Sequence, residues 1–165
     1  MGHDTFLKQW LWGCLIAWTL SLTAVGNPLA GDGSGPAAGP MVEKTEWQGI
    51  TAELLSVERT SGKMLTIKFK YTNVGSDKVE VARIGQFSHD NMLEHVYYID
   101  PQNRKKYLVV KDADGKALGT NLRYLTLEPG ESKAAWGKFP EPPADVQKVS
   151  VYLPGALPFE DVPIH

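Results

Sequence analysis

Cysteine is nearly absent from this sequence: Cys14 is the only one among 165 residues. It lies inside an apolar N-terminal segment, so the remainder of the chain carries no thiol. This excludes disulfides, thiolate nucleophiles, zinc–thiolate sites and type 1 copper sites from that remainder. A domain without such links depends on its hydrophobic core for stability, and about 120 residues are enough to build one.

An excess of charge of either sign is also missing. The chain has 17 lysines and arginines and 19 aspartates and glutamates, and its first 40 residues contain only Asp4, Lys8 and Asp32 of these. The remaining 16 basic and 17 acidic side chains are close to balance. Nucleic-acid binding requires a basic excess or a basic stripe, so we expect no nucleic-acid partner.

Recognisable catalytic motifs are absent too. The sequence has no Gly-x-Ser-x-Gly turn and no glycine-rich loop of the kind that cradles phosphates. The aspartates of "DADGK", residues 112–116, begin like a calcium loop, but Lys116 falls where the third ligand belongs. We therefore predict a turn there and no enzymatic activity, with an enzyme of unrecognisable motif as an alternative.

The N-terminal 26 residues have the order of a secretory signal peptide. Lys8 precedes an uncharged apolar run from Trp10 to Val25, and the small residues Ala24 and Gly26 follow the spacing of a signal-peptidase site. We expect cleavage near Gly26 and export to the periplasm or the exterior. The alternative is an uncleaved membrane anchor over residues 9–25. Residues 27–44, rich in glycine, proline and alanine, are predicted to be a disordered linker before a folded domain at 45–165.

Alternation of apolar and polar residues dominates the predicted domain. In "MLTIKFKY", Leu65, Ile67, Phe69 and Tyr71 share one face and Lys68 lies on the other, which indicates a half-buried strand. We expect further strands at 50–59, 77–84, 94–100, 105–110, 122–127, 133–139 and 148–153, with polar turns between them. This pattern predicts an all-β protein, an antiparallel β-sandwich of about 7–8 strands. Phe69 and Trp136 are predicted core residues, and the prolines after residue 153 are expected to end the last strand.

The second half of the chain resembles a known family. "LEPGESKAAWGKFPEPPADVQKVSVYLPGALPFEDVPI", residues 127–164, is similar to the end of a bacterial immunoglobulin-like, or telokin-like, domain of unknown function. The likeness extends upstream to Ile50 through "LLSVERTSGKMLTIKFKYTNVG" and "YLVVKDADGKALG". The family occurs in small secreted bacterial antigens and attached to outer-membrane-protein-A-like proteins. It implies an exported immunoglobulin-like β-sandwich and provides no established catalytic residues.

One short segment has residues that suit a metal. His89, Met92 and His95 in "HDNMLEH" follow the pattern H-x-x-M-x-x-H, and imidazole with thioether is a ligand set for copper. The alternative is a solvated loop whose polar residues only cap and turn the chain. The main prediction is therefore an exported, non-enzymatic module that binds a protein or a cell-envelope component, with a copper-binding protein as the alternative.

Overall fold

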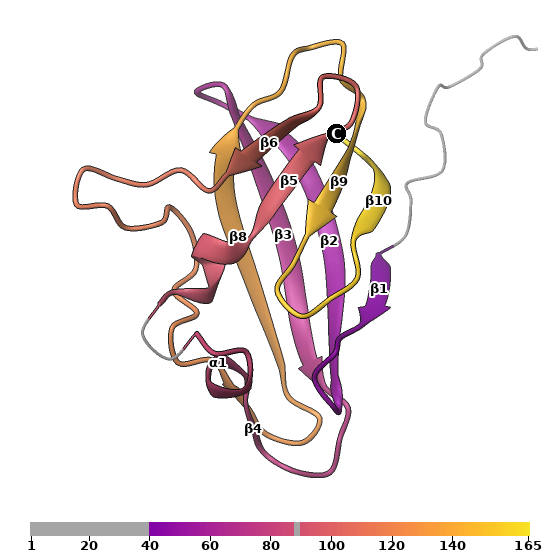
Figure 1. The fold of residues 1–165 in the computed structure, drawn as a ribbon, viewed down its shortest axis with the longest axis vertical. Coiled ribbons are helices and arrows are strands. Elements are labelled where there is room, and N and C mark those ends of the chain that lie inside the picture. The colour runs from indigo at the N-terminus through magenta and orange to yellow at the C-terminus, as the bar shows by residue number, and fades with distance from the viewer. Residues whose placement is uncertain (1–39, 88–89) are drawn as a thin grey trace, which may run out of the picture. The chain divides into compact units, whose positions relative to one another are not determined.

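The computed structural model describes residues 40–87 and 90–165 (Figure 1). Strands make up about half of this part, and every pairing between them is antiparallel. The all-β prediction is thus confirmed for these residues. The elements are β1 (Met41–Lys44), β2 (Ile50–Thr60), β3 (Met64–Asn73), β4 (Val79–Glu80), α1 (Val81–Ile84), the 3-10 turn η1 (Met92–His95), β5 (Tyr97–Asp100), β6 (Lys105–Leu108), β7 (Thr126–Leu127), β8 (Ser132–Pro140), β9 (Lys148–Tyr152) and β10 (Phe159–Pro163).

The first four-stranded sheet has the order β1-β2-β3-β8, and its long hairpin is the one that the alternation predicts. Strands β2 and β3 pair from Ile50 opposite Asn73 to Thr60 opposite Met64. Ile67 and Phe69 point inward and are fully buried, whereas Lys68 lies on the exposed face. The predicted faces of this strand are therefore confirmed.

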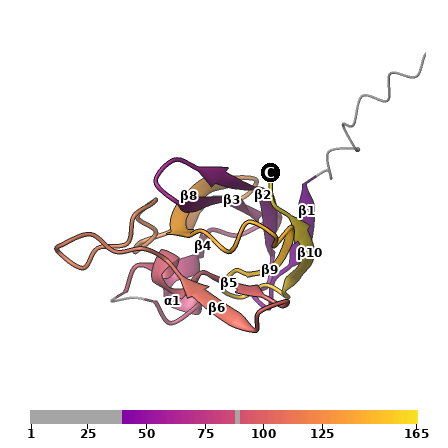
Figure 2. The same ribbon diagram turned by 90° about the horizontal axis from the view of Figure 1, so that it is seen from above.

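The second four-stranded sheet has the order β10-β9-β5-β6. Figure 2 shows it lying across from β2, β3 and β8, with the core between the two sheets. Tyr98 of β5 meets Phe139 of β8 edge to face, with ring centroids 6.0 Å apart. Its hydroxyl donates a hydrogen bond of 2.6 Å to the carbonyl of Pro140, so the phenol satisfies its polar end while the ring stays buried. Tyr71 of β3 does the same toward the carbonyl of Pro154, at 2.8 Å.

Backbone hydrogen bonds also join the two sheets at both sides. On one side, Arg59 N–H donates to the His165 carbonyl at 2.7 Å, and His165 N–H donates to Val57 at 3.0 Å. On the other side, Val110 N–H donates to Lys138, and Lys138 N–H donates to Leu118. These bonds cover the open edges of β2 and β8, which limits edge-to-edge pairing with other chains.

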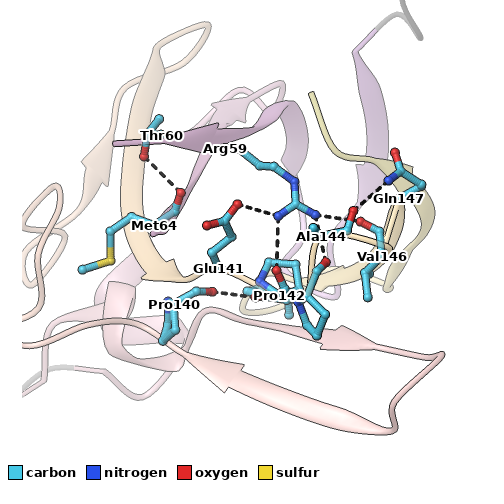
Figure 3. Close-up of polar contacts among 11 residues, drawn as sticks. Arg59, Thr60, Met64, Pro140, Glu141, Pro142, Ala144, Val146 and Gln147 are labelled. Carbon is cyan, nitrogen blue, oxygen red and sulfur yellow. Dashed lines mark hydrogen bonds and ion pairs between the residues drawn. The ribbon is translucent and has the colours of Figure 1, made fainter. Parts of the chain in front are cut away.

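Arg59 fastens the segment that closes one end of the sheets (Figure 3). Its guanidinium pairs with Glu141 at 2.6 Å and donates to the carbonyls of Pro142 and Pro143, each at 3.1 Å, and of Val146 at 2.8 Å. The prolines of this segment cannot donate to a strand ladder, and the arginine fork uses their carbonyls instead. This end lies away from α1 and β4 in Figure 1.

Two terminal strands depart from the prediction. Met41–Lys44 were assigned to the disordered linker, but they form β1 and pair with residues 51–54 of β2, so the fold begins before Thr45. The prolines after residue 153 do not end the sheet, because Phe159–Pro163 form β10 beside β9. The pairing of β9 with β10 contains a β-bulge, a register shift between Phe159 and Val162, which lets the proline-flanked strand join the sheet. Asp161 in this bulge has a φ of 53°.

Two predicted internal strands are much shorter than expected. Of residues 77–84, only Val79–Glu80 form a strand, and α1 follows at once. Of residues 122–127, only Thr126–Leu127 form a strand, which pairs with β4 in a separate two-stranded sheet. The strand predictions from alternation were wrong in both places, because these segments bury apolar residues at irregular spacing.

Trp136 is not a core residue, so that prediction is wrong. Its side chain is 44% exposed and lies opposite Lys68 of β3, on the outer face of the first sheet. The inward positions of β8 are Ala135, Gly137 and Phe139. A glycine at 137 leaves room for Leu93, because a Cβ there would lie 2.9 Å from the buried Leu93 side chain. The core space beside β8 is thus filled by Leu93 from η1.

Candidate functional site

Two of the residues predicted to bind copper lie in different surroundings. Met92 is fully buried in the core, whereas the His95 side chain is 44% exposed. The His95 ring lies beside Phe87, and its Nε2 is 3.8 Å from the Asp90 carboxylate. His89 lies outside the described residues.

Copper binding by this segment stays a prediction. In residues 40–87 and 90–165, no group of three or more histidine, cysteine, aspartate or glutamate side chains is arranged to hold a metal ion. The thioether of Met92 and the imidazole of His89 are not among these side chains. Titration of the full chain with Cu(I) against a competing chelator, beside a His89→Ala/His95→Ala variant, tests the prediction directly: equal uptake by both proteins, or none by either, would contradict it.

Residues 91–94 of this segment have a structural role that their contacts show directly. The Asn91 side chain caps η1, because its Oδ1 accepts from Leu93 N–H at 3.2 Å and from Leu122 N–H at 2.8 Å. The second bond ties η1 to a segment about thirty residues later in the chain. Glu94 also forms an ion pair with Lys111. Residues 91–94 are therefore fixed against the loops that follow β6.

Those loops and η1 enclose a polar cleft of about 540 Å³. Asp112 Oδ1 accepts from the N–H groups of Asp114 and Lys116, both at 2.9 Å, which confirms the predicted turn at "DADGK". Asn121 and Arg123 complete the cleft. Its lining mixes carboxylates, amides and cations and gathers residues far apart in sequence.

Residues 121–126 form a ridge, called the Tyr124 ridge below, that separates this cleft from two further hollows. Members of the ridge line all three, and the other two have volumes of about 310 and 210 Å³. Tyr124 is 79% exposed, the most exposed large hydrophobic side chain in the described part of the chain. Tyr124 lines the two smaller hollows, and an aromatic side chain this exposed between them is well placed to contact a partner.

The ridge is held in place by the residues on either side of Tyr124. Leu122 and Leu125 are only 1% and 6% exposed and anchor the segment in the core. Leu125 N–H donates to the Leu122 carbonyl, and Ala82 N–H of α1 donates to the Leu125 carbonyl at 3.3 Å. These anchors point Tyr124 outward on a supported backbone. The hollows thus lie on a surface formed by loops and short elements.

Sequence reasoning missed this surface because it assigned residues 122–127 to a strand. Strict alternation would place Leu122 and Leu125 on opposite faces, yet both are buried. The spacing of three between these leucines, with Arg123 and Tyr124 between them, was the signal of a tight non-strand turn. Their burial leaves the arginine and the tyrosine in solvent.

Comparison with protein-family models, curated proteins and solved structures finds no match for this chain. Among the residues that the structure describes, no helix has the length and apolar character needed to cross a membrane.

Proposed function

We propose that the chain is an exported, non-enzymatic, immunoglobulin-like module that binds a protein or a cell-envelope component through the Tyr124 ridge. The family resemblance between residues 50 and 164 supports the immunoglobulin-like assignment, as do two facing four-stranded antiparallel sheets. The mechanism is recognition by loops carried on a rigid β framework. The order of charge, apolar run and small residues in the first 26 residues supports export, so any direct membrane attachment belongs to residues 9–25.

The observation that carries the proposal is Tyr124, exposed yet fixed between two buried leucines. Tyrosine is enriched among the residues that dominate binding energy at interfaces. It presents a large amphipathic surface with few rotatable bonds, so little conformational entropy is lost when a partner covers it. The backbone beneath Tyr124 is already ordered by its hydrogen bonds, which lowers the cost of binding further.

Affinity capture from a bacterial envelope extract tests the proposal. The baits are the full chain, a Tyr124→Ala variant and a Trp136→Ala variant, whose tryptophan is the matched exposed aromatic on the outer face of the first sheet. Loss of a central interface tyrosine costs about 2 kcal/mol or more, which lowers affinity by about thirtyfold. We expect Tyr124→Ala to lose the captured component and Trp136→Ala to retain it. Equal capture by all three baits would contradict the proposal.

A further inference from the structure

We infer that the Tyr124 ridge recognises an acidic peptide segment, one that places an apolar side chain in the hollow between the ridge and α1 and a neighbouring carboxylate against Arg83 and Arg123. This inference rests on the proposed function and specifies the chemistry of the partner.

The hollow has an apolar base and a polar rim. Its volume is about 210 Å³, and Ala82 and Leu125, both nearly buried, line it together with Tyr124. Glu80, Arg83, Arg123 and Thr126 line it as well. The hollow exists because β4 pairs with β7 and α1 hydrogen-bonds to Leu125, which brings residues 80–83 against residues 123–126. A ligand here must combine an apolar group with polar or charged groups beside it.

The charges of the rim favour a carboxylate. Arg83 lies 4.0 Å from Glu80, and both side chains are mostly exposed, so this pair is weak and leaves the guanidinium available. Arg123 is exposed and forms no ion pair with any other residue in 40–87 and 90–165. Two guanidinium groups against the one carboxylate of Glu80 leave the rim positive. Guanidinium groups bind carboxylates through paired hydrogen bonds, which adds direction to the attraction.

The same observations argue against polyanions. Nucleic acids and anionic membranes are bound by extended basic stripes, whereas beyond residue 40 the chain carries 16 basic and 17 acidic side chains. Only two arginines border this hollow, and its base is apolar. A short segment with one apolar and one or two acidic side chains therefore fits it better than a phosphate polymer.

Synthetic hexapeptides with a central Leu-Phe pair, flanked on both sides by Glu, Gln or Lys, provide the test. Binding to the full chain is measured at low and at high salt. We expect the Glu-flanked peptide to bind about fivefold tighter than the Gln-flanked one, and the Lys-flanked peptide to bind weakest. The Glu preference should disappear in an Arg83→Gln/Arg123→Gln variant and shrink in high salt. It should persist in Arg104→Gln, which changes an exposed arginine in the β5–β6 turn. Because the three arginines are exposed, circular dichroism should show each variant folded.

The outcomes separate this inference from the function on which it rests. Equal binding of the Glu-, Gln- and Lys-flanked peptides would overturn the inference, and so would preferential binding to phosphatidylglycerol vesicles or to single-stranded DNA. If Tyr124→Ala still abolished capture from the envelope extract, the proposed function would stand without it. A Glu preference lost only in the Arg83→Gln/Arg123→Gln variant would support both.

Discussion

Replacing Arg59 with alanine should destabilise the protein more than replacing any exposed cation. The Arg59 guanidinium makes one ion pair and three hydrogen bonds to backbone carbonyls, all within the segment 141–146. Its side chain is 26% exposed, so solvent screens these contacts only in part. Hydrogen bonds to a charged group contribute about 1.5–3 kcal/mol each but are not additive within one cluster. We expect Arg59→Ala to lower the free energy of unfolding by about 2–4 kcal/mol.

Urea unfolding measures this directly, and two further variants isolate the cause. Arg59→Lys keeps the charge but lacks the planar fork that reaches three carbonyls, so it should recover only part of the loss. Lys68→Ala removes a cation that pairs with Glu58 on the exposed sheet face and should cost about 0.5 kcal/mol or less. If Arg59→Ala and Lys68→Ala cost the same, or if Arg59→Lys unfolds at the wild-type midpoint, the role assigned to the fork is wrong.

Three further predictions concern the core, its phenols and export. Phe69→Ala should cost about 3–5 kcal/mol, because Phe69 is fully buried, whereas Trp136→Ala should cost about 1 kcal/mol or less; equal losses in urea unfolding would contradict the outward position of Trp136. Burial raises the pKa of Tyr71 and Tyr98 above the usual value near 10, so both stay protonated in the folded state while the unfolded chain ionises. The contribution of the two phenols to stability is fully present below about pH 10. Above about pH 10, the free energy of unfolding should fall by up to about 2.7 kcal/mol per pH unit. An unchanged slope in a Tyr71→Phe/Tyr98→Phe variant would contradict this. Finally, intact mass of the protein from an expressing bacterium should show cleavage near Gly26, and a full-length chain held in membranes would favour the anchor.

The sequence predicted the parts of the fold in which alternation is regular. The β2–β3 hairpin, the β5–β6 hairpin, β8 and β9 lie within one to three residues of the expected ranges. Each has an apolar face that meets the other sheet, so the period-2 pattern records the burial directly. The turns at "TSGK" and "EPGE" were also predicted, because glycine with polar residues indicates a chain reversal.

The remaining elements depend on contacts that a local pattern does not contain. Strand β1 has only half-buried and exposed residues and exists because the edge of β2 is available to pair with it. Trp136 was assigned to the core from its position in the alternation, but it stands three residues from Phe139, and a regular strand cannot point both side chains inward. The inward side of β8 at Gly137 is packed by Leu93, from a segment more than forty residues earlier.

The Tyr124 ridge was beyond sequence reasoning for a related reason. Its exposure follows from the burial of Leu122 and Leu125 and from the hydrogen bonds that Asn91 and Ala82 make to the same short segment. None of these partners is close in sequence. The copper prediction, by contrast, came from three residues close in sequence, and the two that the structure describes face different surroundings.

Site-specific photo-crosslinking tests the central claim, that a partner binds at the Tyr124 ridge, most directly. The photoreactive residue p-benzoylphenylalanine replaces Tyr124 in one protein and Trp136 in another, and both positions are solvent-exposed aromatics, so the exchange is conservative at each. Irradiation in the presence of a bacterial envelope extract should yield a discrete crosslinked species from position 124 and none from position 136. Crosslinks of equal yield at both positions, or a discrete species from position 136 alone, would contradict the account.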